Sequence, residues 1–356
     1  MTAIRLQLQN KLLQRLRPPS PAELRVFYIG GYWRGSNDMV AQMLGGLKAA
    51  GVTVQAFNTD DHPEALETDG IPYDRGTSGP VWLVREKLFP PILKFRPHLI
   101  ICNAGGLSFR PQDAATLRGW GIQLLGIALS DPDVYQPTTR KIFKNFDAMY
   151  TNDAATAEAY RQGGVPAYQM PIATNDGFFH PVPPAPEYAC EVLHLGAAHQ
   201  DRIQPVRALV EHFDTHIHGE NWEKHGIQNR GLVYGGETLK ALNSARITIL
   251  FSRTPSGRQT IKVGIFDFLA AGALLATEDF PELRQYFDVQ KEIITFNGVE
   301  EMLAKIRYHL DHPDEAEAIR QAGRAKVLAR YTWKQAWPRI LAPIVRVRGW
   351  EGKPLP

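Results

Sequence analysis

The residues with the clearest potential for chemistry lie at positions 252–272. A polar loop that contains Arg253 leads into an apolar helical pattern, which begins near Lys262 and carries Asp267 in its first two turns. Cations and the amide groups of a helix N-terminus can hold a pyrophosphate, and a carboxylate can accept hydrogen bonds from a ribose diol. We therefore expect Arg253 and Lys262 to stabilise a diphosphate and Asp267 to bind a ribose. The alternative for Asp267 is a favourable charge near the start of its helix.

A second candidate segment surrounds Gly196, at the end of an apolar run. Gly196 would let a phosphate approach the backbone, and Arg202, near the start of the next helical pattern, would neutralise the phosphate charge. His199 is a further candidate for contact with a sugar or phosphate. The alternative for Arg202 is an ordinary solvated side chain.

The third candidate segment follows a short strand-like run at 215–218. Gly219 indicates close packing or a bend beside a ligand, and Trp222 could stack on a base. We include both residues among the expected nucleotide contacts. The alternative for Trp222 is a place in the core, which is the more frequent role of such an aromatic side chain.

Two segments of the first half of the chain could contact a second substrate, an acceptor that carries a hydroxyl group. Gly30 and Gly31 follow an apolar run and precede Arg34, so a backbone turn could approach a ligand there, or the glycines could serve the turn alone. Neither a GxGxxG nor a Walker pattern is present, which argues against dinucleotide and P-loop chemistry. Asp131 or Asp133, after another apolar run, could orient or deprotonate an acceptor hydroxyl; a turn or helix-capping role is the alternative.

The candidate residues lie in a chain that alternates predicted strands and helices. A strand–glycine turn–helix–strand unit opens the chain at 24–57, which is typical of a parallel, doubly wound α/β sheet. Short apolar runs separated by helical patterns then indicate strands covered on both faces. The further strand candidates are 98–102, 124–129, 148–151, 191–195, 215–218, 247–251, 273–276 and 293–296.

The chain length and a change in composition predict two Rossmann-like domains. We expect a short N-terminal helix at 1–20 and a first Rossmann-like domain at 21–170. The proline-rich segment 171–186 cannot be a helix or a central strand and is interpreted as a linker. A second Rossmann-like domain at 187–335 and a crossover helix and tail at 336–356 complete the prediction. A ligand is expected in the cleft where the strand C-termini of the two domains face each other.

Composition excludes several classes of protein. The 356 residues have a formal net charge of +3 and no Lys/Arg run of the kind that binds nucleic acid. The only cysteines, Cys102 and Cys190, lie in apolar runs, so buried free thiols are favoured over a disulfide. Neither a membrane span nor a signal peptide is evident, and the cytoplasm is the expected location.

The opening residues 4–16 form a basic amphipathic pattern, which Pro18 and Pro19 end. Such a helix could rest on an anionic membrane surface, so peripheral contact with the inner face of a membrane is one expectation. The alternative is that the apolar side packs on the protein. The sequence leaves the oligomeric state open.

From about residue 124 to 340 the chain resembles the CgeB-like (spore-maturation-type) glycosyltransferases, relatives of glycosyltransferase family 4. Order and spacing agree over several blocks, and the most distinctive is 266–283, which begins Phe-Asp-Phe-Leu-Ala-Ala-Gly. The other matching blocks are 147–153, 195–196, 218–222, 242–246, 309–313, 322–324 and 331–333.

The resemblance implies the two-domain GT-B fold, with an acceptor domain at 21–170, a nucleotide-sugar domain at 187–335 and a C-terminal helix that crosses back to the first domain. It also implies retaining transfer from a nucleoside diphosphate sugar to a polysaccharide, glycolipid or protein acceptor, without a tightly bound metal or cofactor. In that class the enzyme positions the acceptor hydroxyl and stabilises the departing diphosphate, for which Arg253 and Lys262 are the candidates.

Three positions depart from the family pattern. Asp267 stands where the family has a glutamate, Gln259 where a second acid is frequent, and Gly264 where many CgeB-like chains have an arginine. Lys262 could substitute for that arginine. Two other functions therefore remain open: a catalytically inactive nucleotide- or sugar-binding protein of the same fold, and a GT-B-fold epimerase.

Overall fold

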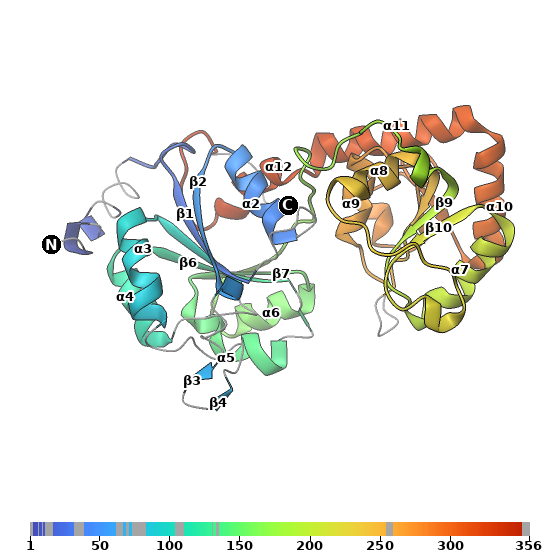
Figure 1. Ribbon diagram of the computed structural model, residues 1–356. Helices are drawn as coiled ribbons and strands as arrows, with labels where there is room; N and C mark the ends of the chain where they lie inside the picture. The colour runs from blue at the N-terminus through green and yellow to red at the C-terminus, as the bar shows by residue number, and fades with distance from the viewer. Residues whose placement is uncertain are drawn as a thin grey trace. The chain divides into compact units, whose positions relative to one another are not determined.

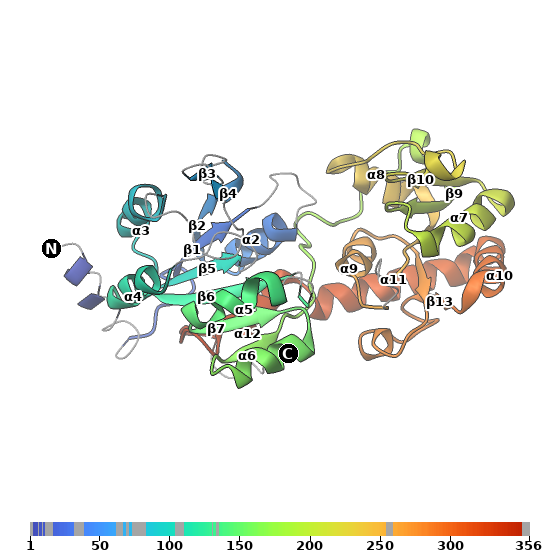
Figure 2. The same ribbon diagram turned by 90° about the horizontal axis from the view of Figure 1, so that it is seen from below.

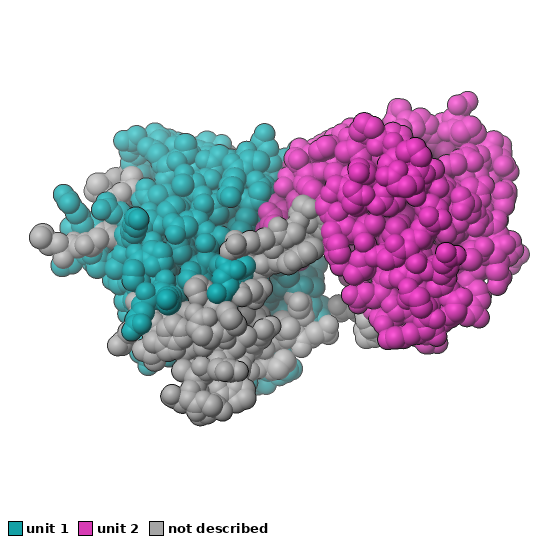
Figure 3. Space-filling view, in the orientation of Figure 1, with its two compact units in different colours: residues 1–34, 43–171, 334–356 teal, residues 35–42, 172–333 magenta. Residues whose placement is uncertain are grey.

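The computed structural model describes most of the chain as two units, which Figures 1 and 3 display. Unit 1 comprises residues 1–34, 43–171 and 334–356, and unit 2 comprises residues 35–42 and 172–333. The described residues are 3–5, 7–8, 10, 17–31, 39–61, 67–68, 71–72, 83–103, 110–129, 131–132, 135–253 and 259–350.

Unit 1 is built on a six-stranded parallel sheet with the order β2-β1-β5-β6-β7-β8. The order reverses between β1 and β5, so the connections that leave these two strands diverge. Its strands are β1 (Arg25–Gly30), β2 (Thr53–Asn58), β5 (Leu99–Asn103), β6 (Gln123–Ala128), β7 (Ala148–Thr151) and β8 (Ala167–Gln169), beside a small antiparallel pair, β3 (Glu67–Thr68) and β4 (Ile71–Pro72).

Helices cover both faces of this sheet, and Figures 1 and 2 place α2 and α12 on the face opposite α4 and α6. Alternate residues of β1 serve the two faces: Phe27 and Ile29 join the core beneath α3, α4 and α6. The helices are α2 (Met39–Ala49), α3 (Phe89–Phe95), α4 (Pro111–Gly119), α5 (Arg140–Ile142), α6 (Ala154–Gln162) and α12 (Trp333–Leu341).

Residues 334–356 rejoin unit 1, which confirms the expected return of the chain. The buried Trp337 donates from Nε1 to the carbonyl of Met43 over 2.8 Å. The hydroxyl of Tyr150 in β7 donates to the carbonyl of Ile340 over 2.9 Å. The last segment of the chain is therefore part of the first unit's core.

Unit 2 is built on a five-stranded parallel sheet with the order β10-β9-β11-β12-β13. Its order reverses between β9 and β11. The strands are β9 (Cys190–Leu195), β10 (Thr215–His218), β11 (Ala245–Ile249), β12 (Leu275–Glu278) and β13 (Ile294–Phe296), and the helices are α7 (Gln200–His212), α8 (Gly236–Ser244), α9 (Val263–Ala270), α10 (Gly298–Asp311) and α11 (Pro313–Arg330).

Two apolar clusters fill the two faces of the second sheet. Val192 of β9 packs with residues of α7 and α10, whereas its neighbour Leu193 packs with residues of α8 and α9. Both clusters are contiguous cores, so the strands are buried on both sides, as their apolar sequences predict. The side of the sheet left for a ligand is the edge at the strand C-termini.

The proline-rich segment is not a free connection. Residues from Ile172 onward belong to unit 2, where Phe179 is buried in the core. Thr174 pairs with Thr332 in a parallel bridge. The reason is that aromatic residues within this polar, proline-containing segment gain more by burial than by exposure.

Both cysteines are free and buried, as predicted. Burial raises the pKa of the Cys102 thiol and of the Cys190 thiol to about 12. Among the described helices, none is both long enough and apolar enough to cross a membrane.

Candidate functional site

The strongest candidate site of unit 2 is the reversal point of its sheet, at the ends of β9 and β11. His194 of β9 is in register with Ile249 of β11, and the two chains then leave in different directions. The chain continues to α7 after β9 and toward Arg253 after β11. A crevice outside strand C-termini at such a reversal is where doubly wound sheets bind ligands.

Arg202 occupies this point. Its guanidinium donates to the backbone carbonyls of Ala197 (3.3 Å), Phe251 (3.5 Å) and Arg253 (3.4 Å). Nε of Arg202 is buried and has no partner, and over the described residues no carboxylate lies within ion-pair distance of this side chain. Burial lowers the pKa of Arg202, partly offset by Asp201 and Glu278. A partly buried cation whose charge is held only by neutral carbonyls favours a bound anion.

The backbone beside Arg202 is fixed by a close contact between two glycines. A Cβ placed on Gly219 would lie 1.9 Å from the carbonyl oxygen of Gly196, so no other residue fits there. The amide of Gly196 donates to the carbonyl of His218 over 2.9 Å. A Cβ on Gly196 would lie 3.1 Å from Nη1 of Arg202. Gly196 and Gly219, both predicted from the sequence, thus allow the loop after β9, the end of β10 and the guanidinium of Arg202 to lie close together.

Trp222 corrects one expectation. Its side chain is fully buried, its Nε1 donates to the carbonyl of Gly196 over 2.7 Å, and it meets the ring of His194 edge-on at 5.5 Å between centroids. It therefore has no exposed face on which a base could stack. Trp222 supports the Gly196 loop from inside the core, which is the alternative role stated above.

A pocket of about 290 Å³ opens beside Gly196 and Gly219. Its wall is mainly apolar, with His218 as a polar member. Nδ1 of His218 lies 3.1 Å from the carbonyl of Gly231, and burial lowers the pKa of this imidazole, which favours its neutral form. The lining residues are Leu195, Gly196, Ala197, His218, Gly219, Glu220, Leu232, Val233, Thr238 and Phe268.

The sequence analysis missed part of this wall. Leu232 and Val233 come from an irregular segment between β10 and α8, which has no periodic pattern that could have indicated them. Gly219 was the only local signal. The pocket is large enough for a flat heterocycle, and its apolar walls suit the faces of one.

The N-terminus of α9 adjoins the loop that ends β11. Lys262 is the N-cap residue of α9 and is half-buried. Arg253 is exposed and forms an antiparallel bridge with Gln259. The carboxylate of Glu278 accepts from the amide and the hydroxyl of Ser252, over 2.7 and 2.9 Å, which fixes the start of the loop. Both predicted cations thus belong to one segment at the C-terminal edge of the sheet.

Packing explains why a glycine, Gly264, stands in the first turn of α9. A Cβ at this position would lie 2.9 Å from Cδ1 of Leu250, so a larger side chain would require Leu250 to move. An arginine, frequent here in the resembling family, would need a different packing of this turn. Lys262, two residues earlier, is a cation at the N-cap of the same helix.

Asp267 is partly buried one turn further along α9. Its carboxylate accepts a hydrogen bond from the hydroxyl of the buried Thr174 over 2.6 Å. Burial raises the pKa of Asp267 to about 7, although the Thr174 bond acts in the opposite direction. A ribose would therefore compete with, or add to, a partner that the sequence analysis missed.

His199 is the half-buried N-cap residue of α7, and its side chain makes no capping hydrogen bond. It lies three residues before Arg202 and follows the pocket-lining Ala197. The structure thus brings His199 to the same edge of the sheet as Arg202, Gly196 and Gly219. The contact of His199 with a ligand stays a prediction.

In unit 1, Gly30 ends β1 at the reversal point beside β5. A Cβ on Gly30 would lie 2.6 Å from both the Cβ of Asn103 and the hydroxyl of Tyr28. The glycine is therefore needed by the fold itself. Gly31 is half-buried, and Arg34 lies outside the described residues.

Asp131 does not face solvent. Its side chain is 2% exposed and accepts hydrogen bonds from the hydroxyls of Tyr160 (2.8 Å) and Thr139 (3.4 Å). Burial raises the pKa of Asp131. This carboxylate holds the interior of unit 1 together, so the expected contact with an acceptor hydroxyl is replaced by the structural role. Asp133 lies outside the described residues.

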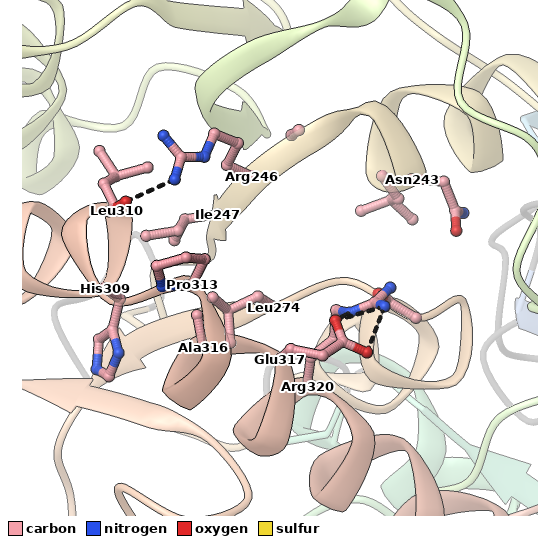
Figure 4. Close-up of a pocket in the computed structure, with 13 residues that line it drawn as sticks. Asn243, Arg246, Ile247, Leu274, His309, Leu310, Pro313, Ala316, Glu317 and Arg320 are labelled. Carbon is pink, nitrogen blue, oxygen red and sulfur yellow. Dashed lines mark hydrogen bonds and ion pairs between the residues drawn. The ribbon is translucent and has the colours of Figure 1, made fainter.

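A second pocket, of 230 Å³, lies at the other end of the unit 2 sheet, where β11 begins (Figure 4). Its cations already have protein partners: Arg246 donates to the carbonyl of Leu310 over 2.6 Å, and Arg320 is paired with Glu317 at 2.6 Å. Arg320 is therefore neutralised, whereas Arg246 is exposed to solvent and lies away from the strand C-termini where doubly wound sheets bind ligands. Over the described residues, no group of three or more His, Cys, Asp or Glu is placed to hold a metal.

Comparisons with known proteins indicate the class of protein. Residues 200–342, which include Arg202 and α9, match the family described as "Glycosyl transferase-like". The spore protein CgeB of Bacillus subtilis is 22% identical over 256 residues, covering 65% of this chain and 78% of CgeB.

Solved structures share the fold. Sucrose-phosphate synthase of Thermosynechococcus elongatus has a TM-score of 0.56 and 17% identity, over 90% of this chain and all of that chain. HepE of Anabaena, solved in complex with UDP-glucose, has a TM-score of 0.57 and 11% identity over the same shares. The predicted GT-B fold class is confirmed by the solved structures, and the family match and the likeness to CgeB support a CgeB-like glycosyltransferase.

Proposed function

We propose that this glycosyltransferase takes its sugar from a nucleoside diphosphate sugar bound at the C-terminal edge of the unit 2 sheet. The observation that carries the proposal is Arg202, which has no carboxylate partner among the described residues and lies beside Gly196 and Ala197, two residues of the wall of the 290 Å³ pocket. An aromatic-sized pocket next to a cation matches a base joined to a diphosphate. The complex of HepE with UDP-glucose supports the same kind of donor.

Each part of the donor has a candidate position. The base enters the pocket between Gly219 and Val233, and the diphosphate lies against Arg202 and the N-terminal amides of α9. Asp267 accepts hydrogen bonds from the ribose. Lys262 and Arg253 stabilise the charge that develops on the diphosphate as the sugar departs.

The proposed reaction is transfer with retention and without a bound metal. The bond between the sugar C1 and the diphosphate oxygen breaks, the acceptor oxygen bonds to C1, and the acceptor proton leaves with the released nucleoside diphosphate. Cations and amides carry the leaving-group charge, so no protein carboxylate has to attack the sugar. The acceptor is a polysaccharide, glycolipid or protein, and the resemblance to CgeB-like enzymes supports this class of acceptor. The proposed location is the cytoplasm.

A binding experiment tests the donor site. We expect UDP, or another nucleoside diphosphate, to raise the melting temperature both in EDTA and in Mg²⁺. Arg202→Gln should weaken this binding about 10- to 100-fold, because a charge-assisted contact contributes roughly 1.5–3 kcal/mol. Arg207→Gln is the matched control, since Arg207 lies on the same helix, is exposed and donates to the carbonyl of His225.

Equal weakening by both substitutions would contradict the assignment of Arg202. A second experiment separates transfer from the other two functions of this fold. Release of nucleoside diphosphate that requires an added acceptor supports transfer. Release without any acceptor would indicate epimerisation or hydrolysis, and binding without release under any acceptor would indicate a binding protein.

A further inference from the structure

The N-terminal helical residues turn a polar side toward unit 1. Asn10 is fully buried and donates from Nδ2 to the carbonyl of Pro97 over 3.2 Å. Gly121, with φ of +77°, leaves the space for this contact: a Cβ there would lie 3.0 Å from the Cβ of Asn10 and 3.4 Å from the carbonyl of Gln7. The hydrogen bond between Asn10 and the carbonyl of Pro97 thus holds this N-terminal segment on the rest of unit 1.

The apolar side of the same segment points away from the protein. Ile4 is 65% exposed and Leu8 is 64% exposed, and their i, i+4 spacing puts them on one helical face. At about 100° per residue, Leu8 and Asn10 lie on nearly opposite sides. The expectation that the apolar side packs on the protein is therefore wrong for these two residues, and Leu12 continues the same spacing in the sequence.

Charge indicates what covers this face. The first 22 residues contain Arg5, Lys11, Arg15 and Arg17 and no acid, which exceeds the net charge of +3 of the whole chain. Arg5 is exposed beside Ile4. Exposed apolar residues among cations are the pattern that binds an anionic bilayer, where each cation near the surface contributes and the apolar side chains insert between headgroups.

We propose that the helical face formed by Ile4 and Leu8 docks unit 1 on a membrane rich in anionic lipid, with both side chains inserted into the headgroup region. The polar anchor through Asn10 holds the helix on unit 1 while its apolar face binds lipid. Such an enzyme would meet acceptors that are themselves embedded in the membrane. This inference is independent of the donor site.

Vesicle co-sedimentation of the full chain tests the proposal. We expect binding to vesicles of mixed phosphatidylglycerol and phosphatidylcholine, little binding to pure phosphatidylcholine, and weakening by salt over the Debye-screening range. Ile4→Asn with Leu8→Asn should lower the partition coefficient on the order of tenfold or more, because two apolar side chains no longer insert. Val210→Asn, at another exposed apolar residue, is the control and should bind like the wild type.

The same variants show which outcome overturns the proposal. The double substitution is on exposed positions, so its melting temperature and its nucleotide binding should equal those of the wild type. Failure of the wild type to bind anionic vesicles, or equal binding by the double variant, would overturn it. So would a change of oligomeric state in the double variant without a change in lipid binding, since the face would then join copies of the chain.

Discussion

At the scale of single residues, Arg202 is a partly buried cation that has no carboxylate partner among the described residues and lies at the reversal point of the unit 2 sheet, the edge proposed to bind the donor (the donor edge). At the other pocket of unit 2, Arg320 is paired with a carboxylate, and Arg246 is exposed and donates to a carbonyl. Arg202 is instead held by three neutral carbonyls at the point where the strand order reverses. The residue type alone predicts a positive charge. Whether that charge is available to bind an anionic ligand depends on the groups that the fold places around it.

Asp267 makes stability depend on pH. Its folded-state pKa is raised to about 7 from 3.8, so the folded protein binds a proton that the unfolded chain has already lost between these values. The free energy of unfolding should therefore fall as pH rises through this window. Asp267→Asn should remove that slope and stabilise the protein above pH 7 by an amount on the order of 1–3 kcal/mol. Urea denaturation across this pH range measures it; an unchanged slope in the variant would contradict the assignment.

Lys262 should matter for the diphosphate more than for folding. Lys262→Ala removes a cation at the N-cap of α9, and we expect nucleoside diphosphate binding to weaken about tenfold or more. His180→Ala is the comparison, because His180 is exposed and lies outside the donor edge. Isothermal titration measures both affinities, and similar losses in the two variants would refute the role of Lys262.

At the scale of elements, the loops after β9 and β10 behave as one unit because Gly219 contacts the backbone of Gly196. Gly219→Ala should destabilise the protein by about 1–3 kcal/mol, since the added carbon would overlap a carbonyl rather than a movable side chain. Gly236→Ala, where a Cβ meets nothing within 4 Å, should be neutral or slightly stabilising. Chemical denaturation compares them, and a neutral Gly219→Ala would show that these loops can separate.

The sequence predicts strands well where burial alone defines them. β7 (Ala148–Thr151) and β10 (Thr215–His218) have the predicted bounds. β11 was expected at 247–251 but is Ala245–Ile249, because its last expected residues leave the ladder to form the donor edge. Periodicity shows that a segment is apolar, and it does not show where a chain leaves the sheet to serve a site.

The site was predicted less completely than the fold. Gly196, Gly219 and Arg202 could be proposed as site residues from the sequence, because a glycine after a strand indicates a backbone turn and an arginine near a helix start indicates a positive charge. The burial of Asp131 and of Trp222, the Thr174 partner of Asp267 and the Val233 wall depend on tertiary packing. None of these leaves a trace in spacing, so no pattern could have separated a core tryptophan from a stacking one.

At the scale of the whole molecule, unit 1 depends on the last segment of the chain. Trp337 is fully buried and bonded to Met43. Trp337→Ala should lower the free energy of unfolding by about 3–5 kcal/mol, the usual cost of emptying a buried aromatic site. Tyr308→Ala, at an exposed aromatic residue of unit 2, should cost far less. Equal costs in denaturation experiments would show that residues 334–356 add little to unit 1.

This closure of unit 1 by residues 334–356 has a consequence for biosynthesis. Synthesis proceeds from the N-terminus at about 5–20 residues per second, so the ribosome completes unit 2 before it releases the segment that carries Trp337. Most of unit 1 is made before residues 172–333, yet it lacks the segment that carries Trp337 until those residues have been synthesised. During that interval the face of its sheet that α12 covers in the folded protein stays uncovered.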